Sequence, residues 1–333
     1  RLIILGDAHQ LPSVSAGSVF RDLVPPAADS SPFASASIHL VENHRMTTDS
    51  VASRSILLAA RSINGGDTTL LNRVDESNAS IVARRSSINE LTFSGVEFLA
   101  ASPGNLGAFL NRWYGDQVEG GTQIAELVAH DYVESDGRFG DADCDRLQRL
   151  FAHVGKSRIL CVTRVFETGA ERVNMRLHSR AAEAADVDSK RAPFVVGEPL
   201  IVLRNDYERG LFNGDAGIRL WVRPSGGTQL AMAVFPRGDN FVAFRFDALR
   251  EFVELGYAMT VHKAQGSEFD SIAIVLPEKP LPVLTRELIY TAVSRSRRSV
   301  VIVGDEATLE HAIATRVERF SGLGDRIKAA LAN

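Results

Sequence analysis

Short runs of apolar, largely β-branched residues recur along the chain, and they constrain the fold more than any other feature. Runs of this length are typical of strands that are buried on both faces of a parallel sheet. Amphipathic stretches separate them, as in 50–64, where Ala52, Ile56, Ala59 and Ile63 share one helical face. The alternation predicts an α/β fold in which helices cover a parallel sheet. The runs are LIIL (2–5), VEFL (96–99), ILCV (159–162), PLIVL (199–203), IAIVL (272–276) and VVIV (300–303).

Residues that favour helix ends accompany several of the amphipathic stretches. The helix over 50–64 is expected to end at Gly65-Gly66, because glycine readily adopts the left-handed conformation of a C-cap. A helix over 143–154 is expected to begin at Asp143, whose carboxylate can cap free backbone N–H groups. Further helices are predicted over 168–185, 286–294 and 306–330.

One stretch has a different pattern. From Gly214 to about Phe252, short apolar strands alternate with turn sequences such as PSGG and PRGDN. Close spacing of this kind is typical of antiparallel strands, and Asn213-Gly214 is itself a strong turn signal. We therefore expect an antiparallel β-module over 214–252, inserted into the α/β domain. The proline-rich stretch 24–37 is expected to be a loop.

Length and composition narrow the class of protein. A chain of 333 residues suits two domains, and its net charge of −4 gives no global attraction to nucleic acid, so any such contact requires a local groove. The two cysteines, Cys144 and Cys161, cannot make a disulfide framework, which favours a reducing, cytoplasmic location. No apolar run approaches the roughly 18 residues of a membrane span, so no membrane partner is expected.

The stretch GDAHQLPSV (6–14) places polar residues just after an apolar run. Ligands of open α/β sheets bind outside the carboxyl ends of the strands, where Asp7 and Gln10 are expected to lie. A carboxylate and an amide there could hold a metal-bound water or sense a phosphate. The alternative is an ordinary strand end, and VVIVGD (300–305) repeats the Gly-Asp ending. The continuation QLPSV is the rarer feature, which favours a role for Gln10.

Two stretches carry arginines suited to phosphate. In ENHRM (42–46), the Arg45 guanidinium could reach a phosphate bidentately, although a lone arginine is more often a surface residue. In RELIYTAVSRSRR (286–298), Arg295, Arg297 and Arg298 gather near the end of a predicted helix. Complementing the helix dipole would explain one or two of them. The functional alternative places one arginine on a nucleotide γ-phosphate.

The stretch YAMTVHKAQGSEFD (257–270) is the densest in polar residues. Gly266 permits a tight turn or close approach of a ligand, and successive N–H groups in such a turn can bind an anion. Thr260, His262 and Lys263 suit contacts to a phosphate backbone, and Glu268 follows closely. A solvated loop would explain any one of these residues, but not the whole string at this spacing.

The sequence Gly155-Lys156-Ser157 resembles the end of a phosphate-binding loop but does not complete one. The pattern G-x-x-x-x-G-K-[ST] requires glycine at position 150, where this chain has Leu150. The three residues also follow a predicted helix and precede a predicted strand, which is the reverse of the required order. We interpret them as a helix C-terminal end. The sequence holds no other candidate for this motif.

Taken in order, these stretches resemble the motifs of superfamily 1 DNA helicases. GDAHQLPSV resembles helicase motif III, ENHRM the arginine-bearing motif IV, YAMTVHKAQGSEFD motif V and ELIYTAVSRSRR motif VI. The closer resemblance is to RecD, the alpha subunit of bacterial exodeoxyribonuclease V. The stretches that carry it are RNDYERGLFNGDAGI (204–218), PVLTRELIYTAVSRSRR (282–298) and IATRVERFSGL (313–323).

The resemblance implies roles for the candidate residues. In this family ATP and Mg²⁺ bind between two RecA-like P-loop NTPase domains, and single-stranded DNA lies across both. Gln10 would sense the γ-phosphate, Asp7 would lie beside the metal-bound nucleotide, and Arg45 and Arg295 would contact the γ-phosphate from the second domain. The remaining residues are Gly266 and Glu268, implied near the nucleotide, and Thr260, His262 and Lys263, implied at the DNA backbone. Ser294 and Ser296 replace the Thr and Ala of many relatives, which should leave Arg295 in place.

The resemblance also implies a domain organisation. Residues 1–40 would be the C-terminal remnant of a first RecA-like motor domain, and 41–213 with 253–333 would form the second. Residues 214–252 would be a small SH3-like β-module, an insertion of the branch that moves 5′ to 3′. The Walker A and Walker B groups of the family would precede motif III and are not found, so we expect this chain alone to be inactive as an ATPase.

Three functions fit these observations. The first is the C-terminal motor portion of an ATP-dependent DNA helicase, the alpha subunit of exodeoxyribonuclease V, acting in double-strand break repair and recombination with beta and gamma subunits. In that family the nuclease belongs to the beta subunit, so none is expected here, nor is a metal-ligand cluster. The second is a stand-alone superfamily 1 helicase or a conjugative relaxase–helicase. The third is a non-catalytic module that binds DNA or a partner subunit.

Overall fold

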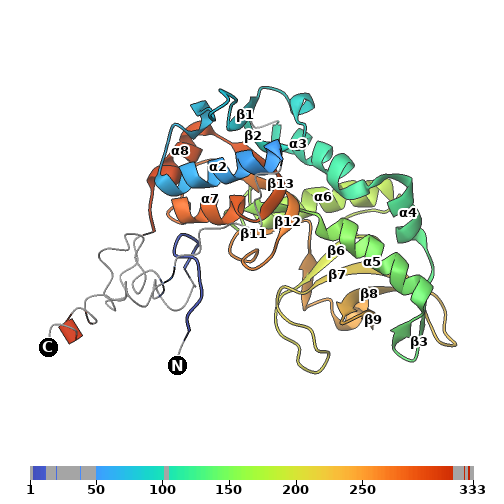
Figure 1. The fold of residues 1–333 in the computed structure, drawn as a ribbon. Helices are drawn as coiled ribbons and strands as arrows, with labels where there is room; N and C mark the ends of the chain where they lie inside the picture. The colour runs from blue at the N-terminus through green and yellow to red at the C-terminus, as the bar shows by residue number, and fades with distance from the viewer. Residues whose placement is uncertain are drawn as a thin grey trace.

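Two β-sheets and the helices packed on them make up the fold (Figure 1). The structure is a computed structural model, which describes residues 3–12, 20, 38, 50–100, 105–317, 326, 329 and 330. Arg45 and the stretch 24–37 lie outside the described residues. No helix within the described ranges combines the length and the apolar character that a membrane span requires.

The first sheet has six strands among the described residues, in the order β1-β2-β13-β12-β5-β11. All of its neighbouring pairs are parallel, as expected. Val300 and Ile302 of β13 face one apolar cluster, whereas Val301 and Val303 face the other, which explains the uninterrupted apolar runs. The runs at 96–99, 159–162, 272–276 and 300–303 are confirmed as strands of this sheet. The strands are β1 (Val82–Arg85), β2 (Gly95–Ala100), β5 (Ser157–Cys161), β11 (Ala258–Thr260), β12 (Phe269–Val275) and β13 (Ser296–Gly304).

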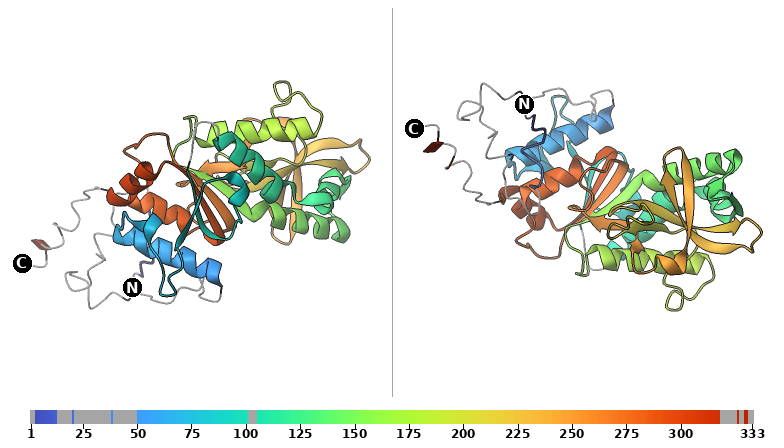
Figure 2. Two further views of the ribbon diagram at one scale, coloured as in Figure 1. Left: turned by 90° about the horizontal axis from the view of Figure 1, so that it is seen from above. Right: turned by 90° about the horizontal axis from the view of Figure 1, so that it is seen from below.

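Helices cover both faces of this parallel sheet (Figure 2). Helices α2 (Val51–Gly65), α7 (Arg286–Val293) and α8 (Glu306–Ala314) pack on one face. Helices α3 (Asn105–Trp113) and α6 (Ala170–Ala184) pack on the other. The end of α2 is confirmed, since Gly66 adopts φ 79° and its N–H returns to the last turn. The result is the three-layered α/β/α arrangement of a RecA-like domain.

The second sheet is antiparallel apart from one parallel pair, and it includes the strands expected within 214–252. Those strands are β7 (Ala216–Pro224), β8 (Leu230–Arg237) and β9 (Asn240–Arg245). Four strands from outside that range join them, so the sheet draws on residues far apart in sequence. The four are β3 (Tyr132–Ser135), β4 (Arg138–Phe139), β6 (Pro199–Val202) and β10 (Val253–Leu255). The likeness to an SH3 fold stays a prediction.

The prediction that PLIVL (199–203) is a strand of the parallel sheet is wrong. This run forms β6, which pairs antiparallel with β7 and with β10. A short apolar run indicates only that both faces of a strand are buried, and that holds here. Leu200 and Val202 enter the core of the antiparallel sheet, while Ile201 reaches the core of the parallel one. Strand β6 therefore links the two sheets.

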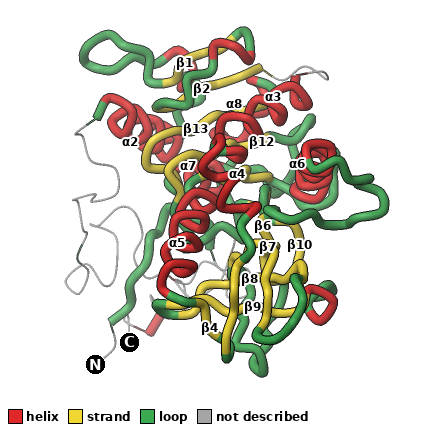
Figure 3. Tube along the Cα trace, turned by 90° about the vertical axis from the view of Figure 1, so that its right-hand side faces the viewer, coloured by secondary structure: helices red, strands yellow, loops and turns green. Residues whose placement is uncertain are grey.

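Helices α4 (Gly121–Ala129) and α5 (Asp141–Gly155) pack on the antiparallel sheet (Figure 3). Helix α5 leads directly into β5. Asp143 is not the N-cap of α5, because that position belongs to Gly140. The Asp143 carboxylate instead accepts a hydrogen bond from the Val133 N–H, which ties the helix to β3. Lys156 joins α5 to β5, which confirms the interpretation of Gly155-Lys156-Ser157 as a helix end.

Two sequence predictions fail near the chain ends. The described part of LIIL, residues 3–5, is not a strand: residues 3–7 have no regular structure, and Ile3 and Leu5 are 83% and 85% exposed. A strand requires a neighbour for its N–H and C=O groups, and no described strand pairs with this run. The helix predicted over 306–330 ends at Ala314, where Thr315 becomes extended and its carbonyl accepts the N–H of Arg286.

Candidate functional site

Arg295 lies at the centre of the candidate site, between α7 and β13. Its side chain is 2% exposed, and three segments hold its guanidinium. Nη2 donates to the Gln10 side-chain oxygen at 2.8 Å, Nη1 to the Ser267 carbonyl at 3.3 Å, and Nε to the Thr291 carbonyl at 3.2 Å. A buried guanidinium with hydrogen bonds in three directions has a fixed position and a full charge.

Arg295, Arg297 and Arg298 are expected near the end of the predicted helix 286–294, but in the described hydrogen bonds only Arg295 reaches that helix. Helix α7 ends at Val293, before any of them. Arg295 donates a hydrogen bond to the Thr291 carbonyl in the last helical turn. This contact is the favourable interaction with the helix dipole that the sequence predicts for one or two of the arginines. Arg297 and Arg298 lie on β13 with exposed side chains, and Arg297 forms an ion pair with Glu268.

Gln10 reaches Arg295 because the segment around it is docked on helix α7 and on the turn that precedes β12. The Leu11 N–H donates to the Thr291 hydroxyl at 2.9 Å, and the Gln265 amide donates to the Leu11 carbonyl at 3.1 Å. The Gln10 amide nitrogen donates to Asp7 at 2.9 Å, which leaves its oxygen facing Arg295. The structure thus brings together two predicted residues that are 285 positions apart.

The Asp7 side chain is exposed. In the contacts that the structure describes, its carboxylate accepts hydrogen bonds that orient neighbouring polar side chains. Besides Gln10, its carboxylate accepts a hydrogen bond from the Tyr290 hydroxyl at 3.4 Å. Burial, together with the nearby Asp7 charge, raises the pKa of Tyr290 to about 12, so this hydroxyl stays a neutral donor at physiological pH. Tyr290 and Thr291 are site residues that the sequence does not single out, because it predicts only a helix over 286–294 and carries no signal specific to these two positions.

Gly266 and Glu268 lie close to Arg295, at the amino ends of β12 and β13. Strand β12 begins opposite the start of β13, and the Phe269 N–H donates to the Arg295 carbonyl at 2.9 Å. Gly266 has φ 86°, and among the described residues no atom outside its two chain neighbours lies within 4 Å of the position that a Cβ would take. A backbone that is open in this way lets a ligand approach closely. The candidate nucleotide residues of this domain therefore meet at the amino ends of two strands.

Thr260, His262 and Lys263 lie at the other end of the sheet, after the carboxyl end of β11. Buried Val261 and Ala264 anchor the turn that carries them. The Thr260 hydroxyl accepts the Lys263 N–H at 3.3 Å, and the Lys263 ammonium lies 2.7 Å from the Glu254 carboxylate. Glu254 was not predicted, and it means that Lys263 would have to exchange a carboxylate for any phosphate.

Asn174 on α6 fixes the strand that leads into this turn. Strand β11 is the last strand of the parallel sheet among the described residues, and one edge of it faces α6. The buried Asn174 amide accepts the Ala258 N–H at 2.7 Å and donates to the carbonyls of Ala258 and Leu255, each at 2.9 Å. One side chain thereby takes the place of a neighbouring strand.

Replacing Asn174 with alanine is expected to lower the free energy of unfolding by about 3 kcal/mol, because buried backbone groups lose their partners. Denaturant unfolding of both proteins measures the difference. The neighbouring substitution Met175→Ala is the control, since Met175 is 55% exposed and its loss should change stability by less than about 0.5 kcal/mol. A loss below about 1 kcal/mol for Asn174→Ala would contradict the role given to this amide.

The arrangement fits an anionic oxygen at Arg295. The guanidinium is desolvated and rigid, Gln10 fixes it from one side, and the open backbone at Gly266 leaves room beside it. Hydrogen bonds to a rigid, partly desolvated cation are stronger than those to a solvated one. In the described part of the chain, no group of three or more His, Cys, Asp or Glu side chains is placed to hold a metal ion. The position of Arg45 relative to Arg295 lies outside the described residues.

Comparison with known proteins gives a consistent set of relatives. The RecBCD enzyme subunit RecD of Mycobacterium tuberculosis is 32% identical over 329 residues, which cover 99% of this chain and 49% of that protein. The subunit of the same name from Mycolicibacterium smegmatis is 30% identical over 331 residues, 99% of this chain and 50% of that protein. The chain thus spans about half the length of the curated relatives it matches.

A solved structure of Pif1 helicase from Bacteroides, in complex with ADP-AlF3 and ssDNA, is 18% identical, with a TM-score of 0.29 and coverage of 80% of this chain and 62% of that one.

The family described as UvrD-like helicase C-terminal domain matches residues 255–303. That stretch holds β11, β12, α7 and β13, and therefore both Thr260 and Arg295. The helix-covered parallel sheet has the arrangement of a RecA-like helicase fold. The chain is thus similar to the RecD subunits of the RecBCD enzyme along nearly its whole length, and to the UvrD-like helicase C-terminal domain over 255–303.

Proposed function

We propose that this chain is the arginine-bearing part of an ATP-dependent DNA helicase motor, the C-terminal motor portion of an exodeoxyribonuclease V alpha subunit. The observation that carries the proposal is the hydrogen bond between Gln10 and Arg295. It joins a candidate phosphate sensor to a buried candidate arginine finger. Such a pair can transmit the state of a bound phosphate from one motor domain to the next.

Magnesium-bound ATP would supply a γ-phosphoryl group whose transfer to water provides the free energy for movement. Arg295 would hold the γ-phosphate oxygens and stabilise the charge that develops on them, with Arg45 as a second contact. Gln10 would orient the Arg295 guanidinium, with Asp7 orienting Gln10 in turn. The open backbone at Gly266 would lie along the nucleotide, and Glu268 would lie beside it. The sequence carries no G-x-x-x-x-G-K-[ST], so residues outside this chain would cradle the β- and γ-phosphates.

DNA would lie along the turn after β11. Thr260 and His262 present a hydroxyl and an imidazole there, and Lys263 adds a charge that Glu254 neutralises in this conformation. Contacts of this kind hold a phosphate backbone without reading its sequence. Closure of the nucleotide site would change the grip of this turn on single-stranded DNA, which would move in the 5′-to-3′ sense of the branch with an SH3-like module.

The proposal includes a domain organisation. Residues 1–40 would belong to a first motor domain, and 41–213 with 253–333 to a second one. Residues 214–252 would be the inserted SH3-like module. The docking of Leu11 on Thr291 and Gln265 supports a contact between the first two parts. The mycobacterial relatives are named as subunits of a RecBCD enzyme, which supports partner subunits for this chain. The proposal takes these partners to be beta and gamma subunits, and it adds a cytoplasmic role in double-strand break repair and recombination.

One relative favours a second function, that of a stand-alone helicase. The ATP-dependent RecD2 DNA helicase of Deinococcus radiodurans is 35% identical over 134 residues, 40% of this chain and 18% of that protein. The mycobacterial relatives match nearly the whole chain instead, and that difference favours a subunit of a complex. Co-purification of the complete protein with partner subunits from its own cell would separate the two functions.

Comparing this chain with the complete protein that carries it tests the proposed function. The chain alone is expected to hydrolyse ATP no faster than a blank, because the groups that cradle the β- and γ-phosphates are missing from its sequence. The complete protein is expected to hydrolyse ATP only when single-stranded DNA is present, and to unwind a duplex with a 5′ tail. Robust DNA-stimulated hydrolysis by the chain alone would contradict the proposal. So would a complete protein without any ATPase activity, which would favour a non-catalytic binding module.

A further inference from the structure

Glu254, on β10, pairs with two cations that come from neighbouring strand ends of the parallel sheet. One carboxylate oxygen lies 2.7 Å from the Lys263 ammonium, and the other lies 3.7 Å from a guanidinium nitrogen of Arg164. Lys263 follows β11, and Arg164 follows β5. These two strands are parallel neighbours, with Thr260 opposite Cys161. The candidate DNA turn and the loop after β5 therefore lie side by side at the carboxyl edge of the sheet.

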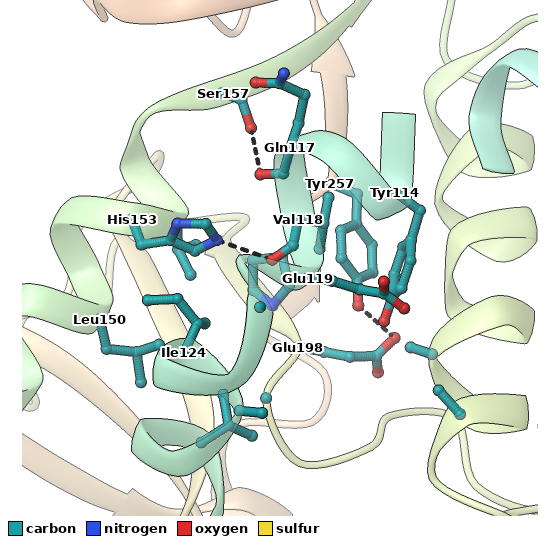
Figure 4. Close-up of a pocket in the computed structure, with 18 of the residues that line it drawn as sticks. Tyr114, Gln117, Val118, Glu119, Ile124, Leu150, His153, Ser157, Glu198 and Tyr257 are labelled. Carbon is teal, nitrogen blue, oxygen red and sulfur yellow. Dashed lines mark hydrogen bonds between the residues drawn. The ribbon is translucent and has the colours of Figure 1, made fainter. Parts of the chain in front are cut away.

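The backbone around Glu254 is fixed by its neighbours. Strand β10 pairs with β6, and the Asn174 amide donates to the Leu255 carbonyl at 2.9 Å. Further along, Tyr257 lines a cavity of about 580 Å³ and donates its hydroxyl to the buried Glu198 carboxylate at 3.2 Å (Figure 4). A paired strand with these contacts on its far side therefore holds the Glu254 carboxylate next to the two cations.

The three charged side chains are reached by solvent to different degrees. The Arg164 side chain is 60% exposed, that of Glu254 is 25% exposed and that of Lys263 is 20% exposed. The Arg164 guanidinium also lies 2.8 Å from the half-buried Glu171 carboxylate. Ion pairs that water can reach contribute little net free energy, because water competes for both partners. The two cations can therefore exchange the Glu254 carboxylate for another anion that arrives from solvent.

A phosphate of single-stranded DNA is the anion that fits this edge. Its two non-bridging oxygens can meet two cations, as the two oxygens of Glu254 do here. Val165 and Phe166, which follow Arg164 in the same loop, are exposed. Exposed aromatic rings together with cations are typical of surfaces that bind single strands, because unpaired bases stack on the rings.

We propose that Arg164 and Lys263 form one phosphate subsite for single-stranded DNA, and that Glu254 competes with the DNA for this subsite. The carboxylate occupies the subsite when DNA is not bound and is displaced when a phosphate enters. An internal competitor weakens the grip without removing the site, which suits a motor that has to release the strand at each step. The inference rests on the proposed function, which places DNA along the turn after β11, and it adds Arg164 as a contact.

Glu254→Gln in the complete protein is expected to tighten binding of a fluorescein-labelled oligo(dT) about threefold or more, because two ion pairs no longer have to be broken. The logarithm of the association constant should also fall more steeply with the logarithm of the salt concentration, by about 0.7 in slope. In the unaltered protein the displaced carboxylate takes up a cation and offsets one that the DNA releases. Fluorescence anisotropy at several salt concentrations measures both quantities.

Glu251→Gln is the matched control for this variant. Glu251 lies three positions earlier, is exposed and takes part in none of the described ion pairs. Its replacement changes the net charge by the same amount. Because solvent and salt screen an exposed charge, the affinity for oligo(dT) should change by less than about 1.5-fold.

Arg164→Ala tests the new contact independently. It is expected to weaken oligo(dT) binding about threefold or more and to make the salt dependence shallower, because one cation leaves the subsite. Arg180→Ala removes the same charge from the other end of α6, where the side chain is also exposed. That control should change the affinity by less than about 1.5-fold.

Lys263→Ala separates this inference from the proposed function. A complete protein that binds no oligo(dT), or that binds it equally well with Lys263→Ala, would overturn the proposed DNA contact of the turn and this inference with it. Suppose instead that Lys263→Ala weakens binding. If Arg164→Ala then has no effect, or if Glu254→Gln tightens binding no more than Glu251→Gln does, only the inference drawn from Glu254 is overturned.

Discussion

Replacing Arg295 with alanine in the complete protein is expected to slow ATP hydrolysis about 10³-fold or more, with a much smaller change in ATP binding. An arginine that meets the γ-phosphate acts mainly on charge that develops in the transition state, and such fingers are worth about 10³–10⁵ in rate. The structure makes Arg295 suited to this role, because it is 2% exposed and held by Gln10, Ser267 and Thr291. Steady-state hydrolysis with saturating single-stranded DNA, together with equilibrium binding of a non-hydrolysable ATP analogue, measures both effects.

Two further variants make this prediction specific. Arg298→Ala removes an exposed arginine three positions along the chain and should leave turnover within about twofold. Arg295→Lys keeps the charge but not the planar fork, so most of the loss should remain. Unchanged turnover in Arg295→Ala would remove this residue from the mechanism. A variant that had lost its cooperative thermal unfolding would be set aside in favour of Arg295→Lys as the deciding measurement.

The parallel sheet could be predicted from sequence because its strands are buried on both faces. Such burial leaves an uninterrupted apolar run, as in 272–276 and 300–303, and both runs are strands of the sheet. The same signal could not tell which sheet a run joins, and β6 entered the other one while remaining buried on both faces. Strand β1 was not predicted from sequence, because Arg84 and Arg85 interrupt its apolar pattern. In the structure Arg85 forms an ion pair with the buried Glu97.

The candidate site was predictable only as separate residues. The sequence motifs identify Gln10 and the arginines near position 295 as candidate residues. No local sequence pattern predicts that two residues 285 positions apart share a hydrogen bond. The contacts that bring them together come from ordinary-looking residues, namely Thr291 within an amphipathic helix and Gln265 in a polar turn. Asn174 is similar, since its role depends on a strand edge that appears only once the sheet has formed.

Replacing Gln10 with alanine is expected to slow DNA-stimulated ATP hydrolysis by about 10–100-fold in the complete protein. The Gln10 oxygen accepts a hydrogen bond from a buried guanidinium, and bonds to charged groups contribute about 1.5–3 kcal/mol, which corresponds to that range of rates. Without it, Nη2 of Arg295 loses a fixed partner and the guanidinium gains freedom to turn away from a phosphate. Gln10→Glu should not restore activity, because its carboxylate would neutralise the charge that the phosphate needs.

A double-mutant cycle decides whether Gln10 acts through Arg295 or independently of it. If Gln10 only positions the arginine, then adding Gln10→Ala to Arg295→Ala should cause no further loss of turnover. The coupling energy would then equal the full effect of Gln10→Ala, about 1.5–3 kcal/mol. His9→Ala serves as the control, because His9 lies beside Gln10 and contacts the Tyr290 ring edge without touching Arg295. Additive losses would show that Gln10 contacts the reacting phosphate in its own right, so that the hydrogen bond seen here would be a resting contact that exchanges when nucleotide arrives.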